Sequence, residues 1–341
     1  MDRYGGIDVG GTSIKYGIVS NGIVESKKII HLAKHVDRLL PKLTKAIRDL
    51  IDNKVNGIGI GFPGHIDQSS QRFLGGPNLK KDISVGEIMK KEGFENYKID
   101  NDGNVAALAE YELFYKEKVK NFIFLSFGTG IGGGVINDSN LIRGKGAAGE
   151  LGHILISTDD KFRPKCSCGL TGCFESLASA KQWSLTVQRI IEVEAQQSKF
   201  HDHRTGEVVE PPDREYVVEG KKYKFGRSEL YRRFHGELEN FSKGSILFNK
   251  NFPLEEHHIE KRDELVSHIA RGLISLYEIF DNEVFVIGGS FTDDENHLVE
   301  LLNERIAKEA KFKLEWRSFP EIHIAQLKSD AGIIGASFLV Q

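Results

Sequence analysis

A strand–glycine turn–strand unit that occurs twice constrains the fold of this chain more than any other feature. In the first copy, the apolar runs Tyr4–Val9 and Ile14–Val19 flank the turn Gly10-Gly11-Thr12. In the second copy, about 117 residues later, the run Phe122–Phe127 leads into Gly128–Gly134 and a further strand pattern. Two related α/β halves that each open with such a unit would enclose a cleft between them.

Glycine makes up 36 of the 341 residues, whereas proline accounts for only 8. The glycine excess therefore does not come from a low-complexity or collagen-like segment. It belongs to tight turns and to places where backbones or ligands approach closely.

Strand and helix patterns alternate along the rest of the chain. Apolar residues at helical spacing predict a helix through residues 36–51, and Gly57–Phe62 has the pattern of a buried strand. The alanine-rich segment Val105–Tyr115 predicts another helix. Towards the C-terminus, the pattern predicts a strand, a helix, a strand and a last helix at Val284–Ile287, residues 298–306, Ile322–Ala325 and Ala331–Leu339. We therefore expect an α/β protein.

One segment departs from this alternation. Residues 196–227 are charged, contain Pro211-Pro212 and lack apolar periodicity, which predicts a polar surface insertion. Within it, Tyr216–Phe225 has the pattern of a small hairpin.

The charge of the chain is nearly balanced, with 46 Lys and Arg residues against 49 Asp and Glu residues. There is no basic excess that would bind nucleic acid or an acidic membrane through counterion release. No window approaches the roughly 18 apolar residues of a membrane-spanning helix, and the N-terminus lacks the pattern of a signal peptide. We expect a soluble cytoplasmic protein without nucleic-acid or membrane partners.

The first glycine turn has the composition of a phosphate site. Gly10 and Gly11 let backbone N–H groups converge on a phosphate, while Thr12 adds a hydroxyl donor and Lys15 a positive charge. Asp8, at the strand end, could hold Mg²⁺ through water. By itself this turn could equally be a tight hairpin, but a second turn of the same design favours two sites that grip one polyphosphate.

The second turn would contribute Gly128, Thr129 and Gly130 to that phosphate site. A third turn, Gly288-Gly289, also follows a strand. Taken alone, it is equally compatible with an ordinary strand-to-helix turn.

A polar cluster, Asp100–Asn104, precedes the helix predicted at Val105–Tyr115. One of its side chains could cap the helix. Asp102 could instead accept a proton from a substrate hydroxyl, since phosphoryl transfer asks mainly for positioning of that hydroxyl. The sequence leaves both roles open.

All three cysteines of the chain, Cys166, Cys168 and Cys173, fall within eight residues, and His153 lies thirteen residues upstream of the first. Three thiolates and one imidazole form the closed tetrahedral ligand set of a structural zinc site. A disulfide scaffold is unnecessary in a chain of this length, and the spacing is not that of a CxxC redox pair. We therefore predict structural Zn²⁺ in a zinc loop of about residues 150–176.

Two carboxylates flank these ligands. Glu150 lies three residues before His153, and Glu175 lies two residues after Cys173, so the loop could hold both near a sugar hydroxyl. A solvated surface position is the alternative for each. The pair His257-His258 has no metal-binding spacing, and we expect it on the surface.

Seven segments resemble motifs of the ROK family (repressors, open reading frames and sugar kinases), in the family's order and over nearly the whole chain. The pair GELGH and CxCGxxGCxE is the most specific part of this resemblance. The segments are DVGGTSIK (Asp8–Lys15), GFPGHID (Gly61–Asp67), NDGNVAALAE (Asn101–Glu110), SFGTGIGGGV (Ser126–Val135), RGKGAAGELGH (Arg143–His153), CSCGLTGCFES (Cys166–Ser176) and VFVIGGS (Val284–Ser290).

This resemblance implies an actin-like ATPase (ribonuclease H-like) fold with two α/β domains around a central cleft. The smaller domain would comprise residues 1–115 and 328–341, because the last helix returns to it. The larger domain would comprise residues 116–327, including the zinc loop and the insertion at 196–227. A homodimer or homotetramer is the expected assembly.

The resemblance also implies ATP-dependent phosphorylation of a hexose, most often at O6. Asp102 would be the catalytic base, and the sugar would contact Gly64, Asn78, Asn101, Asp102, Glu150, His153 and Glu175. ATP and its phosphates would lie against Asp8, Gly10, Gly11, Thr12, Lys15, Gly128, Thr129, Gly130, Gly288 and Gly289. His153 would bind zinc together with Cys166, Cys168 and Cys173.

Several substrates and one other class of protein stay open. Glucose is the first choice, with N-acetylmannosamine and N-acetylglucosamine as alternatives and fructose or allose less favoured. A sugar-sensing protein without catalysis is the rival class, although the intact Asp102 and DVGGT turn argue against it. A repressor would add a helix-turn-helix ahead of the first turn, and the strand pattern at Tyr4 leaves no room for one.

Overall fold

The computed structural model describes residues 2–32, 39–76, 79, 82–157, 164–197, 200–201, 208–209, 214–218, 221–225, 247–249, 254–289, 297–311, 315 and 317–341. Asn78 and half of the insertion predicted at 196–227 lie outside these described residues.

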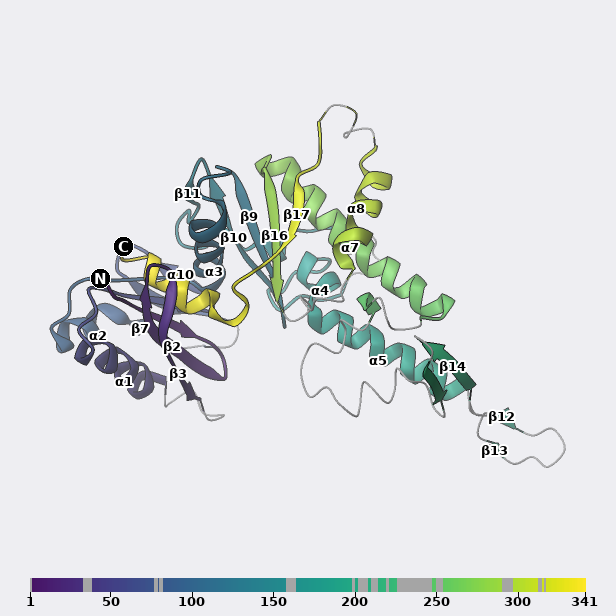
Figure 1. The fold of residues 1–341 in the computed structure, drawn as a ribbon, viewed down its shortest axis with the longest axis horizontal. Helices are drawn as coiled ribbons and strands as arrows, with labels where there is room; N and C mark the ends of the chain where they lie inside the picture. Colours follow the sequence, from purple (N-terminus) through teal and green to yellow (C-terminus); the bar gives the residue numbers. More distant parts are fainter. Residues whose placement is uncertain are drawn as a thin grey trace.

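Two five-stranded sheets of the same topology form the frame of the molecule (Figure 1). The first consists of β1 (Tyr4–Val9), β2 (Ser13–Ser20), β3 (Ile23–His31), β4 (Ile58–Phe62) and β8 (Tyr97–Asn101). The second consists of β9 (Phe122–Phe127), β10 (Ile131–Asn137), β11 (Asn140–Leu141), β16 (Val284–Gly289) and β17 (Glu321–Ile324).

The strand orders are β3-β2-β1-β4-β8 and β11-β10-β9-β16-β17. In both sheets an antiparallel meander is followed by two parallel strands, so corresponding strands have the same order and direction. This likeness is what the repeated strand–glycine turn–strand unit predicted.

A pair of helices lies between the two sheets. The last helix, α10 (Ala331–Phe338), packs on β1 and β4, while α3 (Asp102–Glu110) packs on β9 and β10 and also against α10. Figure 1 shows α10 returning to the first sheet, near the N-terminus. A methyl group on Gly59 would overlap the carbonyl of Ala336, so glycine in β4 permits this close approach.

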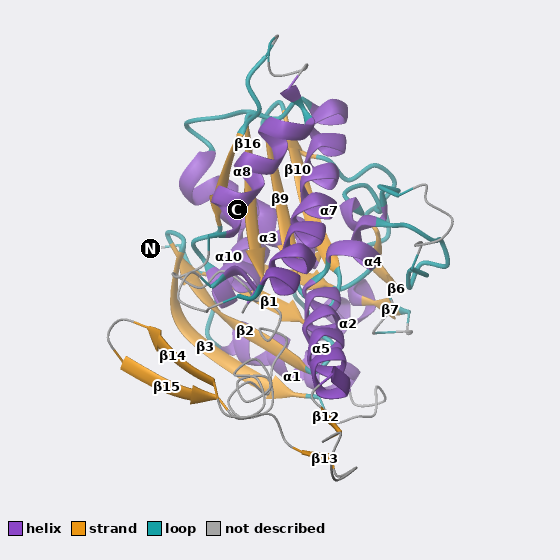
Figure 2. Cartoon of the chain, turned by 90° about the vertical axis from the view of Figure 1, so that its right-hand side faces the viewer, coloured by secondary structure: helices purple, strands orange, loops and turns teal. Residues whose placement is uncertain are grey.

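The outer faces of both sheets are covered by other helices. On the first sheet, α1 (Leu39–Asp52) buries one apolar face, including Leu43 and Ile47. The outer face of the second sheet packs against α4 (Phe174–Ala178), α5 (Ala180–Gln197), α7 (Glu256–Phe280) and α8 (Leu298–Glu309), as Figure 2 shows. Strand β9 is therefore buried on both faces, with Ile123, Leu125 and Phe127 on the outer side and Phe122 and Phe124 on the α3 side.

Smaller elements complete the described chain. A three-stranded sheet of β5 (His65–Asp67), β6 (Arg72–Gly75) and β7 (Ile83–Ser84) precedes α2 (Val85–Glu92). Single turns of helix are η2 (Tyr111–Tyr115, π-helical), η3 (Leu151–His153) and η5 (Lys328–Asp330). Within the predicted insertion lie β12 (Phe200–His201), β13 (Val208–Val209), β14 (Arg214–Val218) and β15 (Lys221–Phe225).

The hairpin predicted at Tyr216–Phe225 is confirmed, because β14 and β15 pair antiparallel with Tyr216 opposite Tyr223. Four helices of the described chain, α2, α4, α5 and α7, go beyond the elements predicted from the sequence. In α7 the signal was present, since Leu265, Ile269, Leu273 and Leu276 have helical spacing and are buried.

The surface position expected for His258 is wrong. His258 is buried at the start of α7, where its Nδ1 accepts a hydrogen bond from the Glu255 backbone N–H at 3.1 Å. The Glu255 side chain in turn accepts from the backbone of His258, so the two residues form a reciprocal N-terminal cap. The role of His258 in capping a helix therefore accounts for its burial, and no metal site is needed to explain it.

Candidate active site

A cleft of about 1380 Å³ brings residues of both sheets together. It is lined by most of the predicted site residues, namely Asp8, Lys15, Gly64, Asn101, Asp102, Gly128, Thr129, Gly130, Glu150, His153, Cys166, Glu175, Gly288 and Gly289. Gly10, Gly11 and Thr12 are not among the lining residues. Most of the residues predicted to bind phosphate, sugar or metal therefore lie around one cleft.

The first glycine turn is a tight hairpin whose strands, rather than its tip, face the cleft. Gly10 N–H donates to the Ser13 carbonyl at 2.8 Å and closes the turn. On the strands beside it, Asp8 and Lys15 are direct partners, and the Lys15 Nζ lies 3.8 Å from Asp8 Oδ2. Burial raises the pKa of Asp8, and the positive charge of Lys15 opposes that rise. This hairpin presents one carboxylate and one cation to the cleft.

The second and third glycine turns lie side by side. β16 pairs parallel with β9, so that Gly288 and Gly289 lie opposite Ser126 and Phe127, the residues just before Gly128. Gly289 has a φ of 118°, a conformation that glycine adopts without strain. The two turns thus form one wall of the cleft.

Asn101 is the cap of α3, and this leaves Asp102 available for another role. The Asn101 side-chain oxygen accepts from the backbone N–H of Gly103 at 2.8 Å and of Asn104 at 3.3 Å, and its amide donates to the Gly64 carbonyl at 3.2 Å. Helix α3 accordingly begins at Asp102, three residues earlier than predicted. Two of the expected sugar contacts, Gly64 and Asn101, are tied directly to each other.

Asp102 opens onto the cleft while lying deep between the two halves of the molecule. Desolvation by the surrounding protein, and then repulsion from Asp8, raise the pKa of Asp102 to about 7. The Gly103 backbone N–H, which donates to Asp102 Oδ1 at 2.9 Å, opposes this rise. A carboxylate with a pKa near neutrality is well matched to accept a proton from a hydroxyl.

Asp102 is also held close to the second glycine turn. A methyl group on Gly103 would lie 2.5 Å from the Gly133 carbonyl oxygen, so α3 starts in direct contact with β10. The glycine run in β10 therefore serves helix packing as well as the turn.

A buried ion pair joins the α3 start to the loop that carries Glu150. Asp100 is 1% exposed and accepts from the Asn101 backbone at 2.8 Å, the Asn104 amide at 2.9 Å and Arg143 Nε at 2.6 Å. Arg143 begins the loop after β11, on the other sheet. Neither residue was predicted for the site, although both stand in or beside the motif segments.

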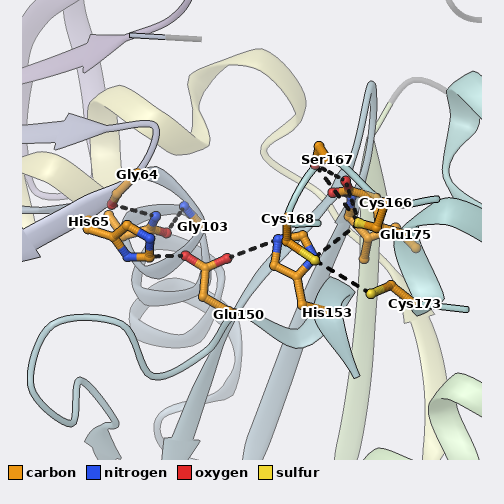
Figure 3. Close-up of polar contacts among 12 residues, drawn as sticks. Gly64, His65, Gly103, Glu150, His153, Cys166, Ser167, Cys168, Cys173 and Glu175 are labelled. Atoms are coloured by element: carbon orange, nitrogen blue, oxygen red, sulfur yellow. Dashed lines mark hydrogen bonds and ion pairs between the residues drawn. The ribbon is translucent and has the colours of Figure 1, made fainter. Parts of the chain in front are cut away.

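Glu150 lies between two histidines, as Figure 3 shows. Its Oε1 is 4.0 Å from His65 Nδ1, and its Oε2 is 3.8 Å from His153 Nε2. His65, on β5, belongs to the GFPGHID segment but was not predicted as a site residue. The row His65–Glu150–His153 connects β5 to the zinc loop, and Glu150 and His153 line the cleft.

The four predicted zinc ligands converge. One ligand atom from each of His153, Cys166, Cys168 and Cys173 lies within 4.8 Å of all the others. Cys166 Sγ is 3.5 Å from His153 Nδ1, and Cys168 Sγ is 3.7 Å from Cys173 Sγ. With Zn–S and Zn–N bonds of about 2.3 and 2.0 Å, a tetrahedron has edges of about 3.8 Å between sulfurs and about 3.5 Å between sulfur and nitrogen.

These separations fit Zn²⁺ held by His153 Nδ1 and three thiolates. Burial, together with the neighbouring cysteines, raises the pKa of Cys173 to about 12, so its thiolate needs a cation beside it. His153 Nε2 remains free to face Glu150, in the way that metal-bound histidines commonly face a carboxylate. A zinc ion here would fix the orientation of His153 towards the cleft.

Glu175, the last of the predicted sugar residues, contacts both the zinc loop and the second glycine turn. Its Oε2 accepts from the Ile131 backbone N–H at 3.1 Å, and its Oε1 accepts from Ser167 Oγ at 3.0 Å. Ser167 was not predicted as a site residue; its place inside the CxC turn is the signal that could have found it.

Comparison with known proteins shows relatives along the whole chain. Residues 4–341 match the ROK family. A glucokinase of Halalkalibacterium halodurans is 27% identical, with 99% of this chain and 94% of that protein covered. An N-acetylmannosamine kinase of Haemophilus influenzae is 26% identical, with 98% and 94% covered.

A solved ROK family glucokinase from Streptomyces griseus, in complex with glucose and AMPPNP, superposes with a TM-score of 0.72 at 24% identity, covering 99% of both chains. This likeness confirms the expected actin-like ATPase fold. In the part of the chain that the structure describes, no helix combines the length and apolar character needed to cross a membrane.

The motifs, the duplicated α/β frame and the match over residues 4–341 agree, and the chain belongs to the ROK family.

Proposed function

We propose that this chain is an ATP-dependent hexose kinase that transfers the γ-phosphoryl group to the O6 hydroxyl of its sugar. One observation carries the proposal: Asp102, with a pKa near 7, lies in a single cleft with the glycine turns and the zinc-loop carboxylates. Relatives named glucokinase and N-acetylmannosamine kinase, similar over nearly their full lengths, support the same reaction. The AMPPNP complex of the similar glucokinase supports ATP as the phosphoryl donor.

In the proposed reaction, the sugar binds against Glu150, His153 and Glu175, while ATP lies along the turns at Gly128 and Gly288. Asp102 accepts the O6 proton as the bond from O6 to the γ-phosphorus forms. The bond between that phosphorus and the β,γ-bridging oxygen breaks, which yields sugar 6-phosphate and ADP. Closure of the cleft would exclude water from the transferred group.

Two metals belong to the proposal, in different roles. Asp8 would hold Mg²⁺ through water, and the ion would neutralise charge on the phosphates when it is bound. His153, Cys166, Cys168 and Cys173 would hold a structural Zn²⁺, which supplies a rigid loop and takes no part in the chemistry.

Glucose is the proposed substrate, with N-acetylmannosamine as the alternative that a relative's name supports. The division into residues 1–115 with 328–341 and residues 116–327 remains part of the proposal, as do a cytoplasmic location and a homodimer or homotetramer. The packing of α10 on β1 and β4 supports placing the C-terminal residues with the first half.

The experiment is an ADP-release assay across a panel of glucose, N-acetylmannosamine, N-acetylglucosamine, fructose and allose. Asp102→Ala should lower kcat by about 10²- to 10⁴-fold, the usual contribution of a general base. The kinase function fails if no sugar stimulates ADP release, or if the Ala variant keeps full activity. Sugar binding without turnover would instead favour the non-catalytic sensor.

A further inference from the structure

We propose that Glu175 and Ser167 form a brace that couples the zinc loop to the second glycine turn. An intact zinc loop would then be needed for binding the nucleotide as well as the sugar. This role presupposes the proposed kinase function, which places the phosphates of ATP at that turn. Glu175 acts in it as a positioning residue for the nucleotide, beyond any contact with the sugar.

The first contact of the brace lies at the beginning of β10. Ile131 follows Gly128–Gly130 directly, and its backbone N–H donates to Glu175 Oε2 at 3.1 Å. Glu175 lies in the first turn of α4, two residues after Cys173. The position of the carboxylate is therefore set by a zinc ligand, and the carboxylate in turn holds the end of the glycine turn.

The second contact holds the other carboxylate oxygen. Ser167, between Cys166 and Cys168, donates its hydroxyl to Glu175 Oε1 at 3.0 Å (Figure 3). Both ends of the cysteine cluster are thus connected to the same carboxylate. Cys166 Sγ also lies 3.7 Å from Glu175 Oε1, so both carboxylate oxygens have partners. These contacts hold the side chain in a single orientation.

Close packing confirms that the turn and the loop are fitted to each other. A methyl group on Gly130 would overlap the Glu175 carboxylate, so glycine is needed for this contact. On the other side, a methyl group on Gly152, next to His153, would overlap the Ile131 carbonyl. Ile131 therefore donates its N–H to one part of the zinc loop, and its carbonyl packs closely against another.

This arrangement has a consequence for substrate binding. Backbone donors stabilise a phosphate best when they are already oriented, since no binding energy is then spent on ordering them. The Gly128 N–H closes the turn on the Gly130 carbonyl at 2.9 Å, and the Lys181 N–H donates to the Gly128 carbonyl at 3.3 Å. Loss of the brace removes the contact that orders the other end of the turn, at Ile131, and leaves that end to be ordered when the nucleotide binds. Because Glu175 also lines the sugar side of the cleft, sugar and nucleotide should each strengthen the binding of the other to the same degree.

The test measures ADP–Mg²⁺ binding by calorimetry without sugar, on zinc-loaded protein whose zinc content is checked for each variant. Glu175→Gln should weaken ADP binding by about threefold to tenfold, because the uncharged amide oxygen accepts a weaker hydrogen bond than the carboxylate does. Glu150→Gln is the matched control, because Glu150 is also a proposed sugar carboxylate but lies beside His65 and His153 instead of the turn. It should weaken sugar binding and leave ADP affinity unchanged.

Ser167→Ala provides a second variant that spares the carboxylate. It should weaken ADP binding in the same direction by about twofold to fivefold, and Ser167→Thr should restore it, because the hydroxyl returns. The brace is refuted if Glu175→Gln and Ser167→Ala both bind ADP like the wild type with zinc in place. It is equally refuted if Glu150→Gln weakens ADP binding as much as Glu175→Gln. Zinc-loaded wild-type protein that binds no ADP would overturn the proposed function itself.

Discussion

Asp102 combines access to solvent in the cleft with the electrostatic environment of a buried group. The protein around it and the charge of Asp8 both disfavour its ionised form, which is why its pKa rises to about 7. Asn101 caps α3, so the capping role does not compete with a catalytic role of Asp102.

The pH profile of the kinase should report this environment. Because Asp102 must be ionised to accept the hydroxyl proton, kcat/KM for the sugar should rise with pH, with its midpoint near pH 7. Asp8→Asn removes a negative charge that raises the pKa of Asp102, so the midpoint should move to lower pH. Steady-state kinetics between pH 5 and 9 measure the midpoint of the kcat/KM profile for the wild type and the variant.

Asp49→Asn is the control for the pH profile, since Asp49 pairs with Lys28 on the surface of the first sheet. Its midpoint should match that of the wild type. A profile that stays flat down to about pH 5, near ordinary carboxylate pKa values, would rule out Asp102 as the titrating base.

The Asp100–Arg143 pair should contribute to stability far more than a surface ion pair. Arg143→Met leaves the buried Asp100 carboxylate without its cation, which should cost about 2–4 kcal/mol in the free energy of unfolding. The Arg48 side chain, which pairs with Glu92, is 63% exposed, so Arg48→Met should have a much smaller effect on the free energy of unfolding. Urea unfolding compares the two, and equal losses would contradict the assigned difference.

Helix α3 connects several parts of the molecule. It begins with the candidate base, packs on β10 and α10, and ends at Glu110, whose Oε1 accepts from the Gln326 and Leu327 backbone N–H groups at 2.8 Å each. Those two residues start the connection from β17 back to α10. One helix therefore links the chemistry to the segment that returns from the second sheet to the first.

Removing Glu110 should destabilise that connection. Glu110→Ala leaves two backbone N–H groups without their acceptor, which should lower the free energy of unfolding by about 2–4 kcal/mol. Glu110→Gln keeps an acceptor oxygen in place and should cost much less. Denaturant unfolding distinguishes the two, and an Ala variant as stable as the Gln variant would contradict this role.

The stability of the wild type and that of Glu110→Gln should depend differently on pH. Burial raises the pKa of Glu110 above its ordinary 4.5, so the folded state favours the protonated form. Its favourable contribution is complete below pH 4.5 and is lost as pH rises through the folded-state pKa. Stability of the wild type relative to Glu110→Gln should therefore fall as pH rises, whereas a constant difference would argue against the raised pKa.

The zinc loop should depend on its metal as a unit. Protein purified without chelator should hold about one zinc per chain, and Cys173→Ser should lower that content and the Tm, because four ligands order one loop. Metal analysis and thermal unfolding measure both. Ser157→Ala, outside the ligand set, should leave zinc content unchanged; zinc-free wild-type protein would disprove the site.

At the scale of the whole molecule, two sheets of equal topology face each other across the α3–α10 pair, and the cleft opens between them. Its volume of about 1380 Å³ exceeds the usual range of about 300–1,000 Å³ for a single small ligand. The cleft is therefore large enough for two substrates, or it belongs to an open form of the molecule that closes when they bind.

We therefore expect the halves to approach each other on binding. Solution X-ray scattering should show a smaller radius of gyration with sugar and a non-hydrolysable ATP analogue than without them, because closure expels water from the cleft. Asp102→Asn should close similarly, since it keeps the shape of the side chain. An unchanged radius for wild-type protein with both ligands bound would exclude closure of this kind.

Patterns that are local in the sequence could be read before the structure was known. The repeat of Gly11-Thr12 as Gly128-Thr129 predicted two halves of one topology, and the spacing of Cys166, Cys168 and Cys173 predicted their convergence. Strand alternation, turn chemistry and ligand spacing act over a few residues, and for this reason each leaves a signature in a short stretch of chain.

Contacts between distant segments were decided by the tertiary structure alone. Asp100 meets Arg143 across 43 positions and Ile131 meets Glu175 across 44, while His65 reaches Glu150 from the other half of the molecule. No local pattern encodes such partners, because they depend on how α3 and the two sheets pack together. The sequence by itself determined the fold, the family and the Cys/His cluster that is the candidate metal site of this protein. Packing decided which carboxylate has a raised pKa, which one is tied to the glycine turn, and which asparagine caps the helix.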